Sequence, residues 1–352
     1  MKIMTLQSRK WLRLRLAVGL VWGISCWVNP AQAEPVDNAL NFLRGQITGT
    51  GFVDSYPDDG TDRSYTYDNA MAALAFISAG DFPSARRILD AFNAIAPPYV
   101  HRYRTQDGRP DGIVNTGHHG YILQAMNLYY VGTGDSRYNL TAQRVGNFLV
   151  SVQDSDGGLF GRPGAPWKST ENNLGAFAAL YNLGRIQNIP YFLEKAELIR
   201  NFLTTECWDG ERFFQGENDR NIVTDVQALG TLALGPDYAG APYWIEWQTL
   251  NTQRYSGRKR VTGFALEAQP PPAVIWTEGT LQMTLAFDVN FDLSRAKAYR
   301  AEAEKLIYPS GALAQASNPG TVGGDPVSRT PAVSPTAWYV LAANKDNVFE
   351  LL

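Results

Sequence analysis

Acidic side chains stand at the beginning of several apolar stretches that have the pattern of buried helices. Four of these stretches carry a carboxylate near their first residue, and a fifth begins with two histidines. The acids are Asp68, Glu171, Asp225 and Glu278, and the histidines are His118 and His119. Hydrolysis of a glycosidic bond needs one carboxylic acid that protonates the leaving oxygen and one carboxylate that activates water or attacks carbon. The four acids are therefore candidate catalytic residues.

A structural role is the alternative for each acid. Threonine is a good N-cap residue, and a carboxylate in the first helical turn interacts favourably with the helix dipole. A threonine directly precedes three of the acids, at Thr170, Thr224 and Thr277. This explanation weakens when four acids converge on one opening, because like charges repel each other and raise each other's pKa.

The same helix starts offer side chains that could hold a sugar. Aromatic rings could form platforms, and amides and imidazoles could hydrogen-bond hydroxyl groups. The candidates are Tyr65, Tyr67, Trp167, Trp208, Trp276, His118, His119, Asn172, Asn173 and Gln227. Among the acids, Glu171 is the preferred proton donor, because Trp167 and the aliphatic helix behind it could desolvate its carboxyl group and raise the pKa. Asp225, expected next around the ring, is the preferred base, with Glu278 and Asp68 as rivals.

Apolar and amphipathic segments alternate along the chain with a single period. The apolar segments begin near Tyr67, His118, Glu171, Asp225, Glu278 and Thr336, about every 50–60 residues. The amphipathic segments are 36–48, 82–94, 137–152, 190–204, 242–255 and 293–307. In 82–94 the apolar residues recur at steps of three and four, as on a helix with one buried face. Six half-exposed helices that alternate with six enclosed ones predict an all-α fold, one (α/α)6 barrel over residues 34–352.

Loop lengths indicate which end of this barrel carries the function. The turns from an inner to an outer helix are short, whereas the segments from an outer helix to the next inner helix are long. The long segments are 95–117, 153–170, 205–224, 256–276 and 308–335. Loops of this length usually carry function or are disordered, and all of these lead to the starts of inner helices. We therefore expect one functional rim, which bears the acids.

Residues 1–33 differ from the rest and predict a secretory signal peptide. A basic start precedes the apolar run 16–28, and Ala31-Gln32-Ala33 is a small-x-small cleavage site. The run is too short and wrongly flanked for a stable membrane span. We expect cleavage after Ala33 and a periplasmic or secreted protein. Cys26 stands in a poor lipidation context, and a mature chain that keeps only Cys207 has no disulfide framework.

The repeated hairpins, the long loops on one rim and the acids at the inner-helix starts resemble the six-hairpin glycosidases, which include glucoamylases, helical-barrel endoglucanases and unsaturated glucuronyl hydrolases. The segments SYTYDNAMAALAFISAGD and STENNLGAFAALYNLG, residues 64–81 and 169–184, resemble bacterial members. The resemblance covers residues 36–346 at the level of architecture and helix starts, and it matches no catalytic signature of one subfamily. It implies a glycoside hydrolase that inverts, as most of these families do.

Composition narrows the range of ligands. The chain has 352 residues, of which 45% are hydrophobic and 18% charged, and a net charge of -3. After residue 15 no Lys/Arg run is longer than the three residues 258–260, so nucleic acid is not an expected partner. The low basic content favours neutral glycans over polyuronates. We expect a carbohydrate substrate, neither metal nor other cofactor, and a monomer; the acidic loop 54–62 fits a solvated loop better than a calcium site.

Four other functions stay open. One is a polysaccharide lyase, a class that occurs on helical toroids but would need a Tyr or His base where the inner-helix starts offer acids. The barrel could bind a glycan or another partner without cutting it. A sugar epimerase shares the predicted fold and uses histidines, but the adjacent His118 and His119 point about 100° apart on a helix. The segment QDSDGGLFG, residues 153–161, resembles a motif of terpene cyclases, although it occurs only once here.

Overall fold

The computed structural model describes residues 30–57, 59–255, 259–268 and 274–352. Residues Val36–Leu352 form one compact unit, and the contacts described below lie within it. The predicted signal peptide falls mainly outside the described residues, so its cleavage stays a prediction. Within the described ranges, none of the helices combines the length and the apolar character that a membrane span requires.

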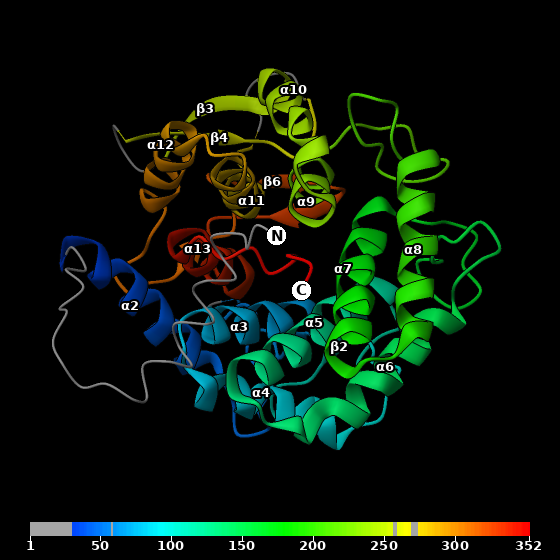
Figure 1. Ribbon diagram of the computed structural model, residues 1–352. Helices are drawn as coiled ribbons and strands as arrows, with labels where there is room; N and C mark the ends of the chain where they lie inside the picture. The colour runs from blue at the N-terminus through cyan, green and yellow to red at the C-terminus, as the bar shows by residue number, and fades with distance from the viewer. Residues whose placement is uncertain (1–29, 58, 256–258, 269–273) are drawn as a thin grey trace, which may run out of the picture. The chain divides into compact units, whose positions relative to one another are not determined.

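Two sets of helices alternate along the described chain. The inner helices are α3 (Thr66–Ser78), α5 (Thr116–Thr133), α7 (Thr170–Gln187), α9 (Thr224–Leu234), α11 (Thr277–Val289) and α13 (Val333–Asn344). The outer helices are α2 (Pro30–Gln46), α4 (Phe82–Ala94), α6 (Asn139–Ser151), α8 (Pro190–Thr205), α10 (Gly240–Thr249) and α12 (Leu293–Glu304). Each inner helix packs against the next, and α13 packs against α3, so the inner ring closes (Figure 1). The predicted (α/α)6 barrel is confirmed.

Small residues allow the inner helices to pack closely. Gly120 of α5 faces Gly175 and Ala176 of α7, and a Cβ atom at Gly120 would lie only 2.9 Å from the backbone nitrogen of Ala176. A larger side chain would push the two helices apart. Because of this close packing, the residues of the inner helices are buried almost all round.

The fifth outer helix is shorter than the sequence indicated. We expected a helix over 242–255, but α10 ends at Thr249 and the chain continues as β3 (Leu250–Arg254). This strand pairs antiparallel with β4 (Arg260–Phe264). Cross-strand contacts stabilise the pair, including a hydrogen bond between the hydroxyls of Thr252 and Thr262 at 2.9 Å. Thr252 and Thr262 lie ten residues apart in the sequence, so the pattern within 242–255 alone does not indicate that its last residues form a paired strand.

Short strands lie in the long segments that lead to the inner helices. β1 (Ser64–Tyr65) pairs with β2 (Arg102–Tyr103), and β5 (Leu313–Ala314) pairs with β8 (Pro331–Ala332). β6 (Gly320–Val322) and β7 (Asp325–Val327) form a hairpin with a two-glycine turn. The first pair joins two successive long segments, whereas the other two pairs lie within the segment between α12 and α13.

The first residue of each inner helix is bonded to the long segment that precedes the next inner helix. Each backbone N–H donates to a carbonyl of that segment, and the last such bond, from Val333 to Ser55, closes the circle. The pairs are Thr66–His101, Thr116–Gly161, Thr170–Gln215, Thr224–Leu266, Thr277–Gln315 and Val333–Ser55. Four threonine hydroxyls donate to the same segments, from Thr66, Thr116, Thr170 and Thr224. The threonines thus join neighbouring hairpins. The capping interpretation, in which they are N-caps of their own helices, is wrong.

The fourth residue of each inner helix is bonded to the long segment that precedes its own helix. Each of these side chains accepts a hydrogen bond from a backbone N–H of that segment at 2.7–3.0 Å and donates to the carbonyl four residues earlier. The six residues are Asn69, His119, Asn173, Gln227, Thr280 and Thr336. We call these residues the clamp ring. Together with the first-residue bonds, the clamp ring holds every inner-helix start between two loops.

Candidate active site

Three of the predicted acids occupy the same position on successive inner helices. Glu171, Asp225 and Glu278 are the second residues of α7, α9 and α11, which are neighbours in the inner ring. Asp68 is the third residue of α3, one place further along. One residue corresponds to a turn of about 100° around a helix, so Asp68 points in a different direction from an acid at the second position. The sequence placed all four at one equivalent position, and this detail is wrong for Asp68.

Glu171 and Asp225 are half-buried and influence each other's protonation. Burial, followed by the charges of Asp225 and Glu278, raises the pKa of Glu171 to about 8. Burial raises the pKa of Asp225 to about 6, against hydrogen bonds from backbone N–H groups that lower it. Around neutral pH this pair therefore favours a protonated Glu171 beside an ionised Asp225.

Asp68 and Glu278 lie deeper and share a partner. They are only 4% and 8% exposed, and Ser334, the second residue of α13, hydrogen-bonds both carboxylates. Burial raises the pKa of each to about 7. Ser55 also bonds Asp68. These two acids are thus held by the protein from several sides, in contrast to Glu171 and Asp225.

Two tyrosines donate hydrogen bonds to the acids. The Tyr67 hydroxyl donates to Oε1 of Glu278 at 2.5 Å and accepts from the indole N–H of Trp338 at 2.9 Å. The Tyr121 hydroxyl donates to Oε1 of Glu171 at 3.4 Å. The rings of Tyr67 and Tyr121 meet edge to face, with centroids 4.9 Å apart. An aromatic layer therefore lies directly behind the acids.

Sequence reasoning missed Tyr121, Trp338 and Ser334. Tyr121 is the sixth residue of α5 and Trp338 the sixth of α13, so both point inward one turn below the first residues. Both occupy the sixth position of an inner helix, and an aromatic residue at the same position in two repeats is a sequence pattern that could have identified them. Tyr56 was missed as well, and its pKa is raised by burial and by the charges of Asp68 and Glu278, which places it near both acids.

In the described part of the chain, Lys and Arg form no ion pair with any of these four carboxylates. The basic residues pair elsewhere, for example Lys168 with Asp154 and Asp156 in the loop that resembles a cyclase motif. An acid without a cation keeps its raised pKa and its repulsion from the next acid. We call Asp68, Glu171, Asp225 and Glu278 the acid group, and structural ion pairs do not explain it.

His118 differs from its neighbour His119. Its Nδ1 atom is buried and has no hydrogen-bond partner among the described residues, and its ring centroid lies 6.4 Å from that of Tyr67. Burial, with the charge of His101, lowers the pKa of His118 to about 4, so the ring is neutral at neutral pH. A buried polar atom without a partner is rare and calls for a ligand or water. His118 remains a candidate ligand for substrate.

Three residues that we predicted to bind substrate belong to the clamp ring instead. His119, Asn173 and Gln227 are completely buried, and their polar atoms bond the loop backbone. A sugar hydroxyl could reach them only if those bonds broke, so we do not retain them as substrate ligands. Asn172 has no such role; it is 8% exposed and its carboxamide lies against Gly117 at the start of α5.

The aromatic candidates fall into two groups. Tyr67 is half-buried in the layer behind the acids, and Trp276 is half-buried as the residue before α11. Trp167 is 44% exposed. In contrast, Trp208 packs against Phe213 within a small apolar cluster, with ring centroids 4.5 Å apart and planes inclined by 49°, which gives it a packing role. Tyr67, Trp167 and Trp276 therefore remain candidates for contact with a sugar.

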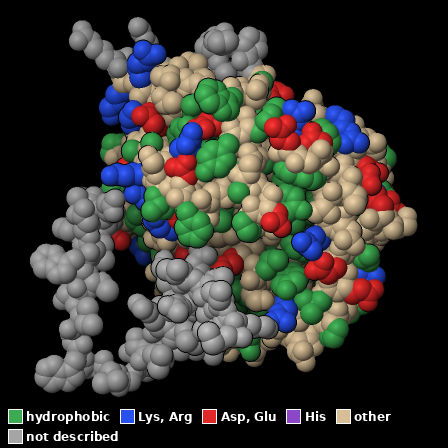
Figure 2. Space-filling model, turned by 45° about the horizontal axis from the view of Figure 1, so that its top comes forward, with side chains coloured by type: hydrophobic (Ala, Val, Ile, Leu, Met, Phe, Trp, Pro, Cys, Tyr) green, Lys and Arg blue, Asp and Glu red, His purple; other side chains and the backbone are tan. Residues whose placement is uncertain are grey.

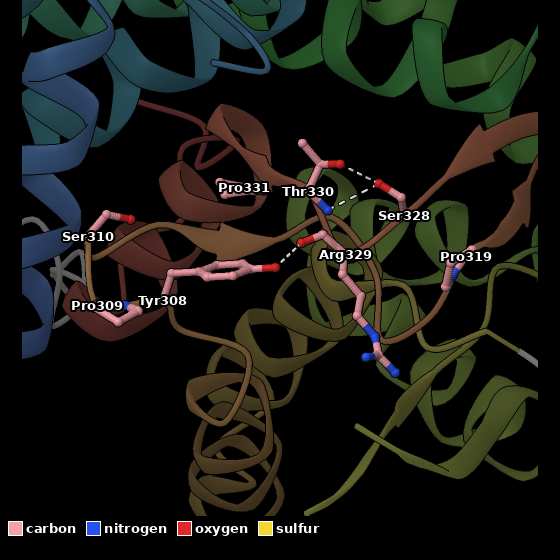
Figure 3. A pocket seen from close by; sticks show the side chains of 8 residues that line it. All are labelled: Tyr308, Pro309, Ser310, Pro319, Ser328, Arg329, Thr330 and Pro331. Atoms are coloured by element: carbon pink, nitrogen blue, oxygen red, sulfur yellow. Dashed lines mark hydrogen bonds between the residues drawn. The ribbon is translucent and has the colours of Figure 1, made fainter. Parts of the chain in front are cut away.

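The structure also contains a hollow apart from the acids. It has a volume of about 680 Å³ and lies in the segment between α12 and α13 (Figure 3). Its lining residues are Tyr308, Pro309, Ser310, Pro319, Ser328, Arg329, Thr330 and Pro331. The Tyr308 hydroxyl donates to the carbonyl of Arg329, and Ser328 bonds Thr330, so these polar groups are already paired. Among the described residues, we find no group of three or more His, Cys, Asp or Glu arranged to hold a metal ion.

Charges are mixed on the face that Figure 2 shows. Lys and Arg side chains alternate there with Asp and Glu and with apolar groups, and they do not merge into one basic area. A surface that binds nucleic acid concentrates positive charge on one face. This face therefore gives no support for such a partner.

Comparisons with known proteins agree on the fold. Neither a known protein family nor a curated protein sequence matches the chain. Solved structures do match. A glycosidase variant in complex with glucose has a TM-score of 0.72 and 12% identity, over 92% of this chain and 99% of that one. A D-mannose isomerase has a TM-score of 0.67 and 10% identity, over 92% of this chain and 99% of that one. An inactive α-1,6-mannanase of Salegentibacter sp. HEL1_6 in complex with α-1,6-mannotriose has a TM-score of 0.62 and 13% identity, over 91% of this chain and 100% of that one. At these identities the likeness shows the (α/α)6 fold alone.

Proposed function

We propose that this protein is an exported glycoside hydrolase that acts on a neutral oligo- or polysaccharide with inversion. The observation that carries the proposal is the group of Glu171, Asp225 and Glu278 at one position of three successive inner helices. Like charges placed together cost stability, so their convergence points to catalysis rather than to support of the fold. Two structural neighbours are glycosidases, one of them in complex with glucose, which agrees with a carbohydrate ligand.

Glu171 is the proposed general acid. Its pKa is raised to about 8, so it carries a proton at neutral pH and can give it to the leaving glycosidic oxygen. Tyr121 orients the carboxyl group through its hydroxyl. The half-buried position leaves the carboxyl group open to a ligand that enters from the long-loop side.

Asp225 is the proposed general base. Its pKa is raised only to about 6, and backbone N–H groups stabilise its ionised form. The ionised carboxylate can remove a proton from a water molecule as that water attacks the anomeric carbon. In an inverting enzyme the two carboxyl groups lie about 6.5–9.5 Å apart, which leaves room for this water. Glu278, whose charge acts on Glu171, then stabilises positive charge that develops on the sugar ring.

The substrate is proposed to be neutral. A polyuronate would bring carboxylates next to four acids, and described Lys and Arg residues form no ion pairs with those acids that could balance the charge. The hydroxyl groups of a neutral sugar, in contrast, suit His118 and Asn172, and the apolar face of its ring suits the rings of Tyr67 and Trp276. Export rests on residues 1–33, with cleavage after Ala33, and N-terminal sequencing of exported protein tests it.

Reducing-end release from a panel of neutral glycans, measured together with binding, tests the hydrolase directly. ¹H NMR of the first product would show the inverted anomer. Glycan binding without release would favour the binding protein that the sequence left open, and the retained anomer would contradict inversion.

A sugar isomerase or epimerase is the second candidate. The observation in its favour is the Nδ1 atom of His118, which has no hydrogen-bond partner among the described residues and could take a proton from a sugar carbon; the D-mannose isomerase neighbour shares the fold. Incubation with aldoses and ketoses, followed by ¹H NMR, distinguishes the two. Isomerisation that is lost in His118→Asn, without hydrolysis of any glycan, would replace the hydrolase proposal.

A further inference from the structure

The chain does not end with its last inner helix. After α13 stops at Asn344, Lys345 adopts the left-handed conformation with φ 58°, and residues 346–352 turn into the barrel. In Figure 1 this red segment crosses the middle of the ring of inner helices. We call residues 346–352 the C-terminal tail.

Four inner helices hold the C-terminal tail. Ser78, the last residue of α3, donates to Asp346, and Asn347 donates to the carbonyl of Leu232 near the end of α9. Deeper in the barrel, Gln124 of α5 donates to the carbonyl of Val348 and Asn182 of α7 donates to that of Glu350. Ser78 and Leu232 lie at the helix ends opposite the acids and Gln124 lies halfway along α5, so the tail enters the barrel from the end opposite the acids.

Phe349 is the tail residue that reaches the aromatic layer. Its side chain is 1% exposed, and its ring meets Tyr121 edge to face at 5.8 Å. The same ring stacks on Trp338, with centroids 6.3 Å apart and planes inclined by 17°. One side chain therefore touches both aromatic residues that lead toward the acids.

Two chains of contacts run from this ring to two different carboxylates. One passes through Tyr121, whose hydroxyl donates to Glu171. The other passes through Trp338, whose indole N–H donates to the hydroxyl of Tyr67, which in turn donates to Glu278. Tyr67 and Tyr121 also contact each other, so the layer is continuous.

We propose that Phe349 is a positioning residue, which fixes the hydroxyls of Tyr121 and Tyr67 on Glu171 and Glu278; its catalytic meaning rests on the proposed function. The physical reason is packing. The rigid Phe349 ring restricts the neighbouring rings to one orientation. A smaller or more flexible side chain would let the tyrosine rings tilt, and both hydrogen bonds would lengthen. A carboxylate that loses a donor becomes less stable in its ionised form.

The test compares Phe349→Leu with Phe92→Leu. Phe92 is also completely buried, but it lies on the outer helix α4, and its ring contacts among the described residues are with Phe52, Tyr99 and Tyr103. Titration of protein labelled with ¹³C at the glutamate carboxyl carbons reports the two pKa values directly, with Glu171→Gln and Glu278→Gln to assign the signals. We expect Phe349→Leu to raise both pKa values by about 0.5–1 unit and Phe92→Leu to leave them in place.

Two further variants separate positioning from general loosening. Phe349→Tyr keeps the ring and should restore both pKa values. In a Tyr67→Phe/Tyr121→Phe background, Phe349→Leu should add no further shift, because the hydroxyls through which it acts are gone. If Phe349→Leu does not fold, Phe349→Met carries the same comparison. Unchanged carboxyl pKa values in the folded variant, or equal shifts in Phe92→Leu, would overturn the proposal.

Kinetics then connect the tail to the reaction. On a hydrolysed glycan, Phe349→Leu should lower kcat about tenfold with little change in KM, since the ring does not face substrate. The carboxyl titration needs no substrate. A pKa shift without any hydrolase activity would therefore uphold the positioning role and count against the proposed function, and the two failures are distinguishable.

Discussion

The second and fourth residues of the inner helices lie only two places apart, yet they differ in almost every physical respect. At the fourth position the clamp ring consists of buried, neutral side chains whose donors and acceptors are paired with backbone groups. At the second position, three of the six residues are carboxylates without cation partners among the described residues. Burial raises the pKa of all three, and repulsion from neighbouring acids raises those of Glu171 and Glu278 further. The clamp ring stabilises the fold, whereas the acid group lowers stability.

This difference indicates how the barrel supports an unfavourable charge cluster. Each acid-bearing helix start is fixed between two loops by its first and fourth residues, so the second residue cannot move away to relieve repulsion. Charged groups that are held in place by paired neighbours are typical of active sites, where some stability is given up for function.

Loss of the acids should have the largest effect. We expect Glu171→Gln and Asp225→Asn each to lower kcat about 10²–10⁴-fold on a hydrolysed glycan, because each removes a proton-transfer group. Thermal stability should stay equal or rise, since one repelling charge is gone. Glu197→Gln, on an exposed outer helix, is the control and should change neither. A loss of activity that merely follows a loss of folded protein would break the comparison.

Loss of a clamp should do the opposite. Asn173→Ala removes an amide that accepts from the N–H of Leu159 and donates to two carbonyls, and those buried groups would be left without partners. We expect a loss of about 1–3 kcal/mol in the free energy of unfolding from chemical denaturation, with kcat per folded molecule nearly unchanged. Asn172→Ala, one residue earlier, is the matched variant and should cost less stability. Equal losses in the two variants would contradict a distinct clamp ring.

The acid group should also make stability depend on pH. Its four members have folded pKa values of about 6–8, above the ordinary carboxyl values, so the folded state binds more protons than the unfolded state between about pH 4 and pH 8. The stability they contribute is thus present at the acidic end of this window and is lost as pH rises. Differential scanning calorimetry should show a lower Tm at pH 8 than at pH 5, and the slope should flatten in Glu171→Gln/Glu278→Gln. A slope unaffected by that double substitution would mean that other groups cause it.

The smallest effect should come from the first-residue threonines. Thr170 donates to the carbonyl of Phe214, whereas the hydroxyl of Thr277 is buried without a partner among the described residues. Thr170→Val should therefore cost about 1 kcal/mol in denaturant unfolding, and Thr277→Val should be neutral or stabilising. Similar costs at both positions would show that the hydroxyl bonds do not hold the hairpins together.

The sequence predicted the barrel and the acids because both repeat. The helix 82–94 and five of the six inner-helix starts were found within two residues, since period and loop length depend on local pattern. The offset of Asp68 and the clamp role of Asn173 were not predictable, because they depend on which loop reaches each helix start. Tyr121, Trp338 and Phe349 meet only when the ring closes and the tail enters it, and their separation in the chain hides that contact.

One comparison of substrates tests the central claim most directly. An aryl glycoside of an acidic phenol releases its phenolate without protonation, so an enzyme that lacks its general acid still hydrolyses it. Loss of the general base, in contrast, slows the hydrolysis of all substrates. We predict that Glu171→Gln loses about 10²-fold or more on the natural glycan but keeps most of its rate on a dinitrophenyl glycoside of the same sugar, and that Asp225→Asn loses both activities. If Glu171→Gln lost equal activity on both substrates, or if Asp225→Asn kept full activity, the assignment of acid and base would be contradicted.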